Sequence, residues 1–398
     1  MSSSALVIGV GMIPFTKPGA NEPYPVMAEN ATRLALADAG LSYDSVQQAY
    51  VGYVYGDSTA GQRALYEVGK TGIPIINVNN NCATGSTALY LARQAVATGV
   101  ADCVLALGFE QMNPGSLGAV FKDRPSPFDH FDAAAESLLG TSQIPLALRY
   151  FGGAGLAHMQ QYGTRLETFA KIRAKASRHA ANNPLALFRT ILTEEQVMSA
   201  PVMWPGVMTR LMACPPTCGA AAAILCSEDF AKRHGLERRV RIAAQAMTTD
   251  RPEALESKDM REVVGIGMAR AASQTVYEQA GIGPRDLDVV ELHDCFAHNE
   301  LITYEALGLC PQGGAEKFVV DGENTYGGQV VTNPSGGLLS KGHPLGATGL
   351  AQCFELTQQL RGSAERRQVE GARMGLQHNL GLGGACVVTL YERMGTTS

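Results

Sequence analysis

Short apolar runs alternate with helical patterns through the first 110 residues of the chain. The apolar runs have the length and composition of buried strands, and the segments between them repeat apolar residues at helical spacing. The expected strands are 5–9, 49–55, 73–78 and 103–109, and the expected helices are 26–39 and 82–97. This alternation predicts a doubly wound α/β layer with a largely parallel sheet.

The same rhythm returns in the last 160 residues. The expected strands there are 240–246, 287–293, 373–379 and 385–391, and the expected helices are 260–280, 299–307 and 345–360. Two halves with one pattern predict a duplicated fold. We assign residues 1–117 to the first half and 239–398 to the second. The apolar run 219–226 predicts a core strand, so residues 211–238 are expected to complete the first half.

Residues 118–210 break the rhythm with proline-rich turns, and we expect them to form an inserted loop domain. A basic helical stretch within this segment carries most of its positive charge. Its basic residues are Arg165, Lys171, Arg173, Lys175, Arg178 and His179. Two interpretations remain open: a solvated helix face, or a lid whose cations meet a phosphate-bearing substrate.

Composition narrows the classes of protein that fit. A chain of 398 residues with 45% apolar residues can bury two or three cores. A net charge of -5 without a basic block argues against nucleic acid or an anionic membrane surface as partner. No apolar run reaches the roughly 18 residues that a membrane span needs. Together with the absence of an export signal, this predicts a soluble cytoplasmic protein.

Nine cysteines, an odd number without a CxxC pair, predict reduced thiols. The segment Cys214-Pro-Pro-Thr-Cys218 does not have the spacing of a zinc knuckle, so no metal site is expected there.

Two distant segments carry the strongest chemical signal. Cys82 follows three asparagines and precedes Ala-Thr-Gly, and the same Ala-Thr-Gly recurs shortly after His343. A helix start after capping asparagines would favour the Cys82 thiolate, and its backbone N–H groups would hold an oxyanion. His343 is then the expected proton acceptor. The alternative is that Cys82 is a small buried residue and His343 a loop residue.

Two further segments add candidate groups. His293, Cys295 and His298 lie with acidic residues at the end of an expected strand, and we interpret this as a catalytic loop rather than a metal site. The glycine-rich stretch 377–385 is either a simple hairpin connection or a backbone oxyanion donor, with Gly381 as the candidate.

These four segments resemble those of the thiolases, in the same order and over nearly the whole chain. The form His293-Asp294-Cys295-Phe296 is similar to the sterol-carrier-protein type of thiolase. Ordinary thiolases have a second cysteine where this chain has Asn379, which suggests that Cys295 has taken over as acid. The chain stops after its final strand, so no fused lipid-transfer domain is expected. It also lacks the peroxisomal tripeptide, which fits a cytoplasmic enzyme.

The resemblance implies a duplicated five-layered αβαβα core with a loop domain over the active site, in a homodimer or homotetramer. It implies coenzyme A as cosubstrate and no permanently bound cofactor. Substrate contacts are expected from Phe296 and from the loop-domain helix. That helix carries Phe169, Lys171, Arg173 and Lys175.

Three functions follow as hypotheses. The first is thiolytic cleavage of 3-ketoacyl-CoA to acyl-CoA and acetyl-CoA or propionyl-CoA through an acyl-Cys82. The second is a condensing acyltransferase that runs toward synthesis, as related ketoacyl synthases do; these commonly pair the cysteine with two histidines, and His293 keeps this open. The third is a non-catalytic protein that binds acyl-CoA or lipid.

Overall fold

The two halves of the chain have the same strand order. This computed structural model describes residues 5–115, 118, 120–237 and 239–395. The first half orders its strands β3-β2-β4-β7-β1, and the second orders them β10-β9-β11-β12-β8. The strands of the first half are β1 (Ala5–Met12), β2 (Gln48–Gly52), β3 (Ile75–Val78), β4 (Cys103–Glu110) and β7 (Gly219–Ser227). Those of the second are β8 (Val240–Thr248), β9 (Val289–Glu291), β10 (Val331–Thr332), β11 (Met374–Gly381) and β12 (Ala385–Arg393).

Strand directions repeat as well. β2 lies parallel to β3 and β4, as β9 does to β10 and β11. β7 and β12 run antiparallel to both of their neighbours. The duplication is therefore confirmed, but the sheet is mixed rather than largely parallel, because the last strand of each half returns beside its first. A short antiparallel contact between β1 and β8 pairs Ala5 with Ile242 and Leu6 with Arg241. It joins the two halves into one ten-stranded sheet.

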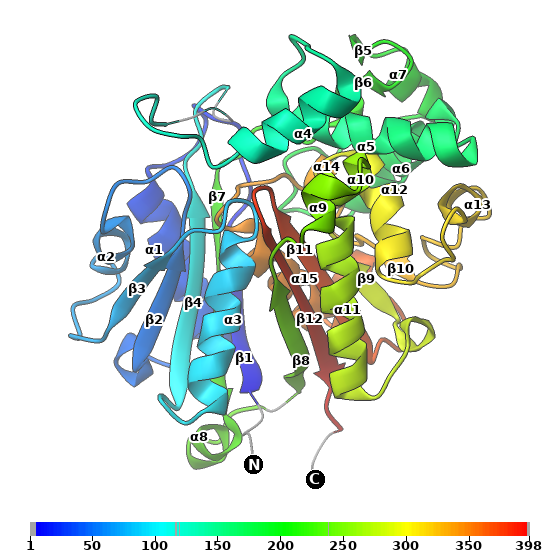
Figure 1. Ribbon diagram of the computed structural model, residues 1–398. Helices are drawn as coiled ribbons and strands as arrows, with labels where there is room; N and C mark the ends of the chain where they lie inside the picture. Colours follow the sequence, from blue (N-terminus) through cyan, green and yellow to red (C-terminus); the bar gives the residue numbers. More distant parts are fainter. Residues whose placement is uncertain (1–4, 116–117, 119, 238, 396–398) are drawn as a thin grey trace.

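Helices complete five layers (Figure 1). Helices α1 (Tyr24–Ala39) and α2 (Ala60–Leu65) cover the outer face of the first half. Helix α11 (Ile266–Ala280) covers that of the second half, with α12 (Ala297–Ala306) beside it. Between the halves lie α3 (Thr84–Ala97) and α15 (Thr348–Arg361), which contact one another. The predicted αβαβα core is confirmed.

The two central helices meet at their starts through the repeated Ala-Thr-Gly. A Cβ on Gly85 would lie 2.7 Å from the carbonyl oxygen of Gly346, and one on Gly349 would lie 2.3 Å from the backbone nitrogen of Ser86. Only glycine permits this approach of backbone to backbone. The repeat thus brings together the two chain segments that carry Cys82 and His343.

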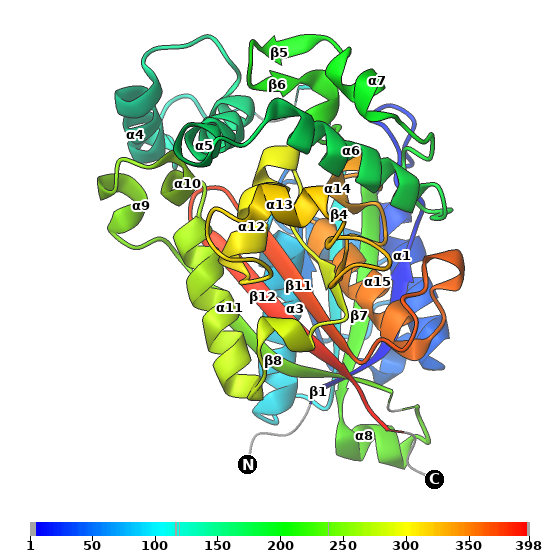
Figure 2. The same cartoon turned by 90° about the vertical axis from the view of Figure 1, so that its right-hand side faces the viewer.

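A cap of helices covers one end of the layers, at the top of Figure 1. It consists of α4 (Asp129–Leu139), α5 (Leu146–Tyr162), α6 (Leu166–Ala180), α7 (Glu194–Met198), β5 (Val202–Trp204) and β6 (Met208–Thr209). Helix α6 lies across α12, α13 (Ala315–Val320) and α14 (Gly337–Ser340), as Figure 2 shows. The assignment of residues 118–210 to a separate loop domain stays a prediction. Residues 117 and 238, at which two of the predicted domains end, and the last three residues lie outside the described residues.

The remaining helices are short. They are α8 (Glu228–Arg233), α9 (Glu253–Glu256), α10 (Met260–Val263) and the 3-10 turns Tyr43–Ser45, Arg210–Met212, Pro284–Asp286 and Glu365–Arg367. The expected helix 260–280 is interrupted, because Gly265 adopts a left-handed conformation (φ 93°) between α10 and α11. In the described part of the chain, no helix is both long and apolar enough to cross a membrane.

Candidate active site

Cys82 lies in a tight turn between β3 and α3, two residues before the helix begins. The N-cap is Ala83, without a side-chain cap. The prediction that asparagines cap this helix is therefore wrong: Asn80 donates to Thr87 Oγ1, and Asn81 donates to the carbonyl of Leu382. Thr84 holds the turn instead, because its Oγ1 donates to the Asn81 carbonyl and accepts from the Asn80 N–H.

Cys82 is buried, with 9% of the residue exposed, and its surroundings favour the protonated thiol. Burial, followed by the nearby carboxyl of Glu110, raises the pKa of Cys82 to about 12. Burial thus opposes the expected stabilisation of the thiolate by a helix start. A neutral thiol at pH 7 must lose its proton to a neighbouring base before it can attack.

Glu110 ties the turn of His343 to the first half of the molecule. Its buried carboxyl accepts from the backbone N–H groups of Val54, Tyr55 and Gly346. Burial raises the pKa of Glu110 to about 7, against the lowering effect of these three donors. The sequence offers no sign of this contact, which spans 236 residues to Gly346.

We expect iodoacetamide to label Cys82 ahead of Cys103 and Cys226, which have no exposed surface in β4 and β7. With a pKa of about 12, the rate at Cys82 should rise about tenfold per pH unit from pH 7 upward. Peptide mass spectrometry after timed labelling measures this. A plateau near pH 7, or equal labelling of the three cysteines, would contradict the protonated, accessible thiol.

His343 lies between α14 and α15, and its hydrogen bonds assign its tautomer. Its Nδ1 is 2.6 Å from Thr348 Oγ1, and that hydroxyl donates its hydrogen to the Pro344 carbonyl at 3.0 Å. Nδ1–H must therefore be the donor to Thr348, which leaves the lone pair on Nε2. Nε2 is buried and has no hydrogen-bond partner among the described residues. Burial, with Lys341, lowers the pKa of His343 to about 3.

His293 has the opposite tautomer. Asn379 Nδ2 lies 3.0 Å from His293 Nδ1, so an amide N–H donates to that nitrogen and the proton resides on Nε2. The two imidazoles meet edge to face, with centroids 5.0 Å apart at 84°. Burial, followed by His343 and His378, lowers the pKa of His293 well below its usual range. One neutral histidine thus offers a lone pair, and the other offers an N–H donor.

Cys82, His293 and His343 each place one sulfur or nitrogen atom within 4.8 Å of the other two. That spacing alone would suit a metal ion. However, the Nδ1 lone pair of His293 is taken by Asn379, so only Cys82 and His343 offer free lone pairs in these tautomers. The arrangement suits a nucleophile, a base and a hydrogen-bond donor better than a metal centre.

Cys295 follows His293 in the loop that leads into α12, and it is buried. Burial raises the pKa of Cys295 well above its usual range, and Cys214 and Cys82 raise it further. Its carbonyl accepts from the Cys214 N–H at 2.9 Å. Cys214 belongs to the segment 213–218, which also pairs Ala213 with Phe296 and Pro216 with His343. The sequence of this segment suggests only a metal motif to be excluded, and its place at the border of the site follows from these tertiary contacts.

The glycine-rich turn lies against the Cys82 turn. It is the hairpin connection between β11 and β12, as expected for one of the two interpretations. A Cβ on Gly381 would lie 2.2 Å from the Asn80 carbonyl and 3.1 Å from the Ala83 nitrogen. Glycine is thus required for the close approach of Gly381 to the turn that carries Cys82, and its oxyanion role stays a prediction.

Only half of the basic stretch faces solvent, because Arg165, Lys171 and Arg178 are exposed or partly exposed while the other three basic residues are not. Arg173 donates to Ser340, and Lys175 pairs with Glu300; both cations are buried because α6 packs against α12 and α14. His179 is buried as well. Lys171 stays partly exposed, 3.4 Å from Glu194. The expectation that Arg173 and Lys175 receive phosphates is therefore wrong.

The two phenylalanines are also internal. Phe169 is fully buried and stacks on His298 with centroids 4.1 Å apart, while Phe296 is 4% exposed and stacks on Phe151. Phe169 cannot contact a ligand in this arrangement. His298 donates its Nε2–H to the Val207 carbonyl at 2.8 Å, so it belongs to the packing of the cap and not to the Cys82 cluster.

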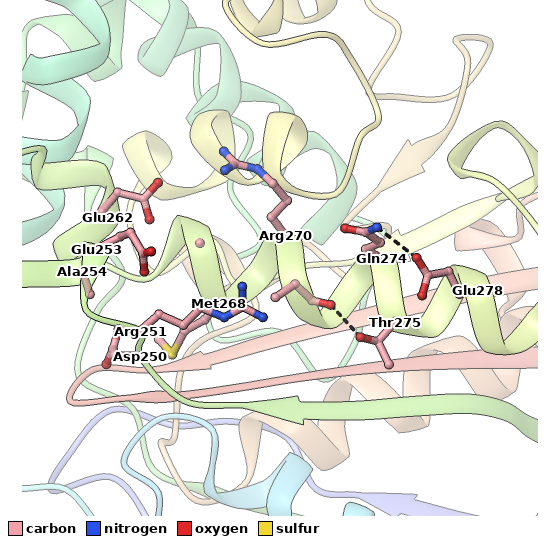
Figure 3. Close-up of a pocket in the computed structure, with 12 residues that line it drawn as sticks. Asp250, Arg251, Glu253, Ala254, Glu262, Met268, Arg270, Gln274, Thr275 and Glu278 are labelled. Carbon is pink, nitrogen blue, oxygen red and sulfur yellow. Dashed lines mark hydrogen bonds between the residues drawn. The ribbon is translucent and has the colours of Figure 1, made fainter. Parts of the chain in front are cut away.

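A separate hollow of about 400 Å³ opens beside α11 (Figure 3). Its lining is charged, with Asp250, Glu262 and Arg270 among the side chains drawn there. None of the cysteines or histidines described above lines it. The candidate active site is the Cys82 cluster.

Comparison with known proteins agrees with this geometry. The model of the thiolase N-terminal domain matches residues 5–135, and a thiolase C-terminal domain-like model matches 252–391. The chain belongs to the thiolase family.

Relatives of this thiolase include human sterol carrier protein 2, which is 56% identical over 97% of this chain and 71% of the relative. An acetyl-CoA acetyltransferase of Methanothermobacter thermautotrophicus is 35% identical over 90% of this chain and 92% of that one. The fold is shared with human mitochondrial 3-ketoacyl-CoA thiolase, solved in complex with CoA, at 20% identity and a TM-score of 0.74 over 99% of this chain and 98% of that one. The protein is a thiolase-type acyltransferase.

Proposed function

We propose that this thiolase cleaves 3-ketoacyl-CoA and transfers the resulting acyl group to coenzyme A. The observation that carries the proposal is the meeting of the Cys82 thiol, the His343 Nε2, which no described residue hydrogen-bonds, and the N–H tautomer of His293. The loop His293-Asp294-Cys295-Phe296 and the similarity to sterol carrier protein 2 support the sterol-carrier-protein type.

Acyl transfer to Cys82 follows from the three groups. His343 Nε2 takes the thiol proton as Cys82 Sγ attacks the 3-keto carbon. The oxyanion that forms needs donors, and His293 Nε2–H and backbone N–H groups at Cys82 and Gly381 are the candidates. Collapse of this intermediate breaks the C2–C3 bond, which leaves an acyl-Cys82 and the enolate of acetyl-CoA or propionyl-CoA.

The departing enolate needs a proton, for which Cys295 is the candidate. His343 already holds the Cys82 proton, and the Asn379 amide does not titrate near neutral pH. The raised pKa of Cys295 keeps its thiol protonated until the strongly basic enolate forms. The Cys295 thiolate then takes the proton of the incoming coenzyme A, whose sulfur attacks the acyl-Cys82. The Cys82 thiolate leaves as the acyl-CoA forms and regains its proton from His343. The complex with CoA in the human mitochondrial enzyme supports coenzyme A as cosubstrate.

Intact-protein mass spectrometry with a panel of short, medium, branched and steroid-side-chain 3-ketoacyl-CoA thioesters tests the proposal. We expect an acyl adduct on the Cys82 peptide and loss of substrate when coenzyme A is added. Binding without an adduct and without turnover would instead indicate a protein that only binds acyl-CoA or lipid.

Synthesis is the second candidate function. The edge-to-face pair His293 and His343 beside Cys82 is the two-histidine arrangement that favours it. Assays in both directions, with coenzyme A and carrier-protein thioesters, separate the two. Condensation that exceeds cleavage under matched concentrations would reverse the proposed direction.

Replacing Cys295 with alanine should separate the two half-reactions. Acyl transfer to Cys82 from a simple thioester should persist, while cleavage of 3-ketoacyl-CoA and α-proton exchange of acetyl-CoA in deuterated solvent should fall about 100-fold. Cys386→Ala, at a buried cysteine of β12, is the matched control. Normal exchange in Cys295→Ala would move the acid to His293 or to water.

A further inference from the structure

A chain of buried hydrogen bonds links His293 to groups that take no part in the proposed chemistry. It runs from Tyr391 of β12 through Gln377 of β11 and Ser86 of α3 to Asn379 and His293. All five side chains are buried. The chain crosses between the halves of the molecule, because Ser86 belongs to the first half and the other four residues to the second.

The direction of these bonds is fixed by a backbone carbonyl. Gln377 lies 2.7 Å from the carbonyl oxygen of Gly349, which can only accept, so the Gln377 atom there is the amide nitrogen. The Tyr391 hydroxyl accordingly donates to Gln377 Oε1. The second N–H of Gln377 donates to Ser86 Oγ, also at 2.7 Å.

The same argument fixes the donors and acceptors of the hydrogen bonds that lead to the active site. Because Ser86 Oγ accepts from Gln377, its hydrogen is free to donate to Asn379 Oδ1 at 2.7 Å. Asn379 therefore turns its Nδ2 toward His293 Nδ1, 3.0 Å away. We infer that Gln377 and Ser86 are positioning residues that, through Asn379, hold His293 with its proton on Nε2. The catalytic consequence rests on the proposed function, whereas the tautomer does not.

A reversed chain would harm the proposed reaction. If Asn379 presented its oxygen to His293, Nδ1 would hold the proton and the Nε2 lone pair would face the site and repel an oxyanion. Gly349 also leaves the room that the chain of hydrogen bonds needs, since a Cβ there would lie 2.2 Å from Ser86 Oγ and 2.8 Å from Asn379 Oδ1. The second Ala-Thr-Gly thus needs its glycine for this chain of hydrogen bonds as well as for helix packing.

Histidine ¹⁵N chemical shifts report the tautomer without any substrate. In the intact enzyme labelled with [¹⁵N]histidine, His293 should show a protonated, pyrrole-type Nε2 and a pyridine-type Nδ1, and His343 the reverse. The signals of His293 are assigned by their loss in His293→Gln. Asn379→Asp offers only acceptors to Nδ1, so it should move the proton of His293 to Nδ1 or leave the ring doubly protonated, with His343 unchanged.

Ser86→Ala tests the chain of hydrogen bonds one residue further from His293 than Asn379. We expect a mixture of His293 tautomers and a roughly tenfold lower kcat with KM nearly unchanged, against a loss of about 10²–10³ for Asn379→Asp, as for removal of an oxyanion donor. Ser273→Ala removes a buried helix hydroxyl that bonds only to the Arg270 and Ala306 carbonyls, and it should change neither readout.

Three results would overturn the inference. The first is a wild-type His293 with its proton on Nδ1. The second is a fall in kcat with unchanged His293 signals, which would reduce Ser86 to a structural role. The third is altered tautomers in both variants with normal kcat, which would break the link to catalysis. Should Ser86→Ala fail to fold, Gln377→Glu decides the question, because it offers only acceptors to Ser86 Oγ, turns the Ser86 hydrogen away from Asn379 and should give the same mixture of His293 tautomers. A wild-type enzyme that shows the expected tautomers but no acyl transfer would contradict the proposed function and leave the inference about the tautomer intact.

Discussion

Cys82→Ser should fold normally and lose acyl transfer by at least about 10⁴-fold, in the range of other nucleophile deletions. The reason lies in the base as much as in the nucleophile. His343, with a pKa of about 3, is a weak acceptor that has to work on a thiol, and an alcohol holds its proton far more firmly.

The measurements are turnover of 3-ketoacyl-CoA and the mass of the intact protein after exposure to substrate. Cys310→Ser is the matched control, because Cys310 is as exposed as Cys82, at 9%, and belongs to a different core cluster. A serine variant that keeps more than one hundredth of the activity, or an acyl adduct on another cysteine, would rule out Cys82 as the nucleophile.

His343→Ala should lower kcat/KM by about 10³–10⁴, at the upper end of general-base loss, because Cys82 cannot ionise by itself at neutral pH. Thr348→Val is the graded variant. It removes the hydroxyl that accepts from the His343 Nδ1–H, so the ring is free to change tautomer. We expect kcat/KM to fall about 10-fold to 100-fold.

The pH profile provides a second readout. With its pKa lowered to about 3, His343 stays neutral throughout the range above pH 4, so wild-type kcat/KM should show no acid limb near pH 6.5. His179→Ala is the control, since His179 is 4% exposed like His343 and lies outside the cluster. Activity of His343→Ala within tenfold of wild type, or an acid limb near 6.5 that this variant abolishes, would contradict the assignment.

The fold was largely predictable because its elements have strong local patterns. Alternating apolar runs and helical periods identified both halves, and the repeated Ala-Thr-Gly singled out Cys82 and His343. The strand directions could not be foreseen in the same way, because only tertiary pairing returns β7 and β12 beside the first strand of each half.

The site could be predicted in its identities but not in its electrostatics. The Cys82 pKa depends on burial and on Glu110, which the chain brings from β4. The basic helix has the same periodicity whether it faces solvent or α12, so sequence could not show that Lys175 pairs with Glu300. Thr217 and Ser86 are single hydroxyls without a motif, and only the packed structure reveals that they bond His343 and Asn379.

The glycine contact between α3 and α15 has a consequence for how the enzyme comes into being. Cys82 and His343 belong to different halves, and Gly85 and Gly349 bring them together only when the two helix starts dock. Neither half can therefore hold a reactive pair by itself during synthesis or refolding. Recovered activity is thus a direct signal that the halves have docked in register, and a nascent chain cannot form the reactive pair until the segment that carries His343 and α15 has been made and has docked on the first half.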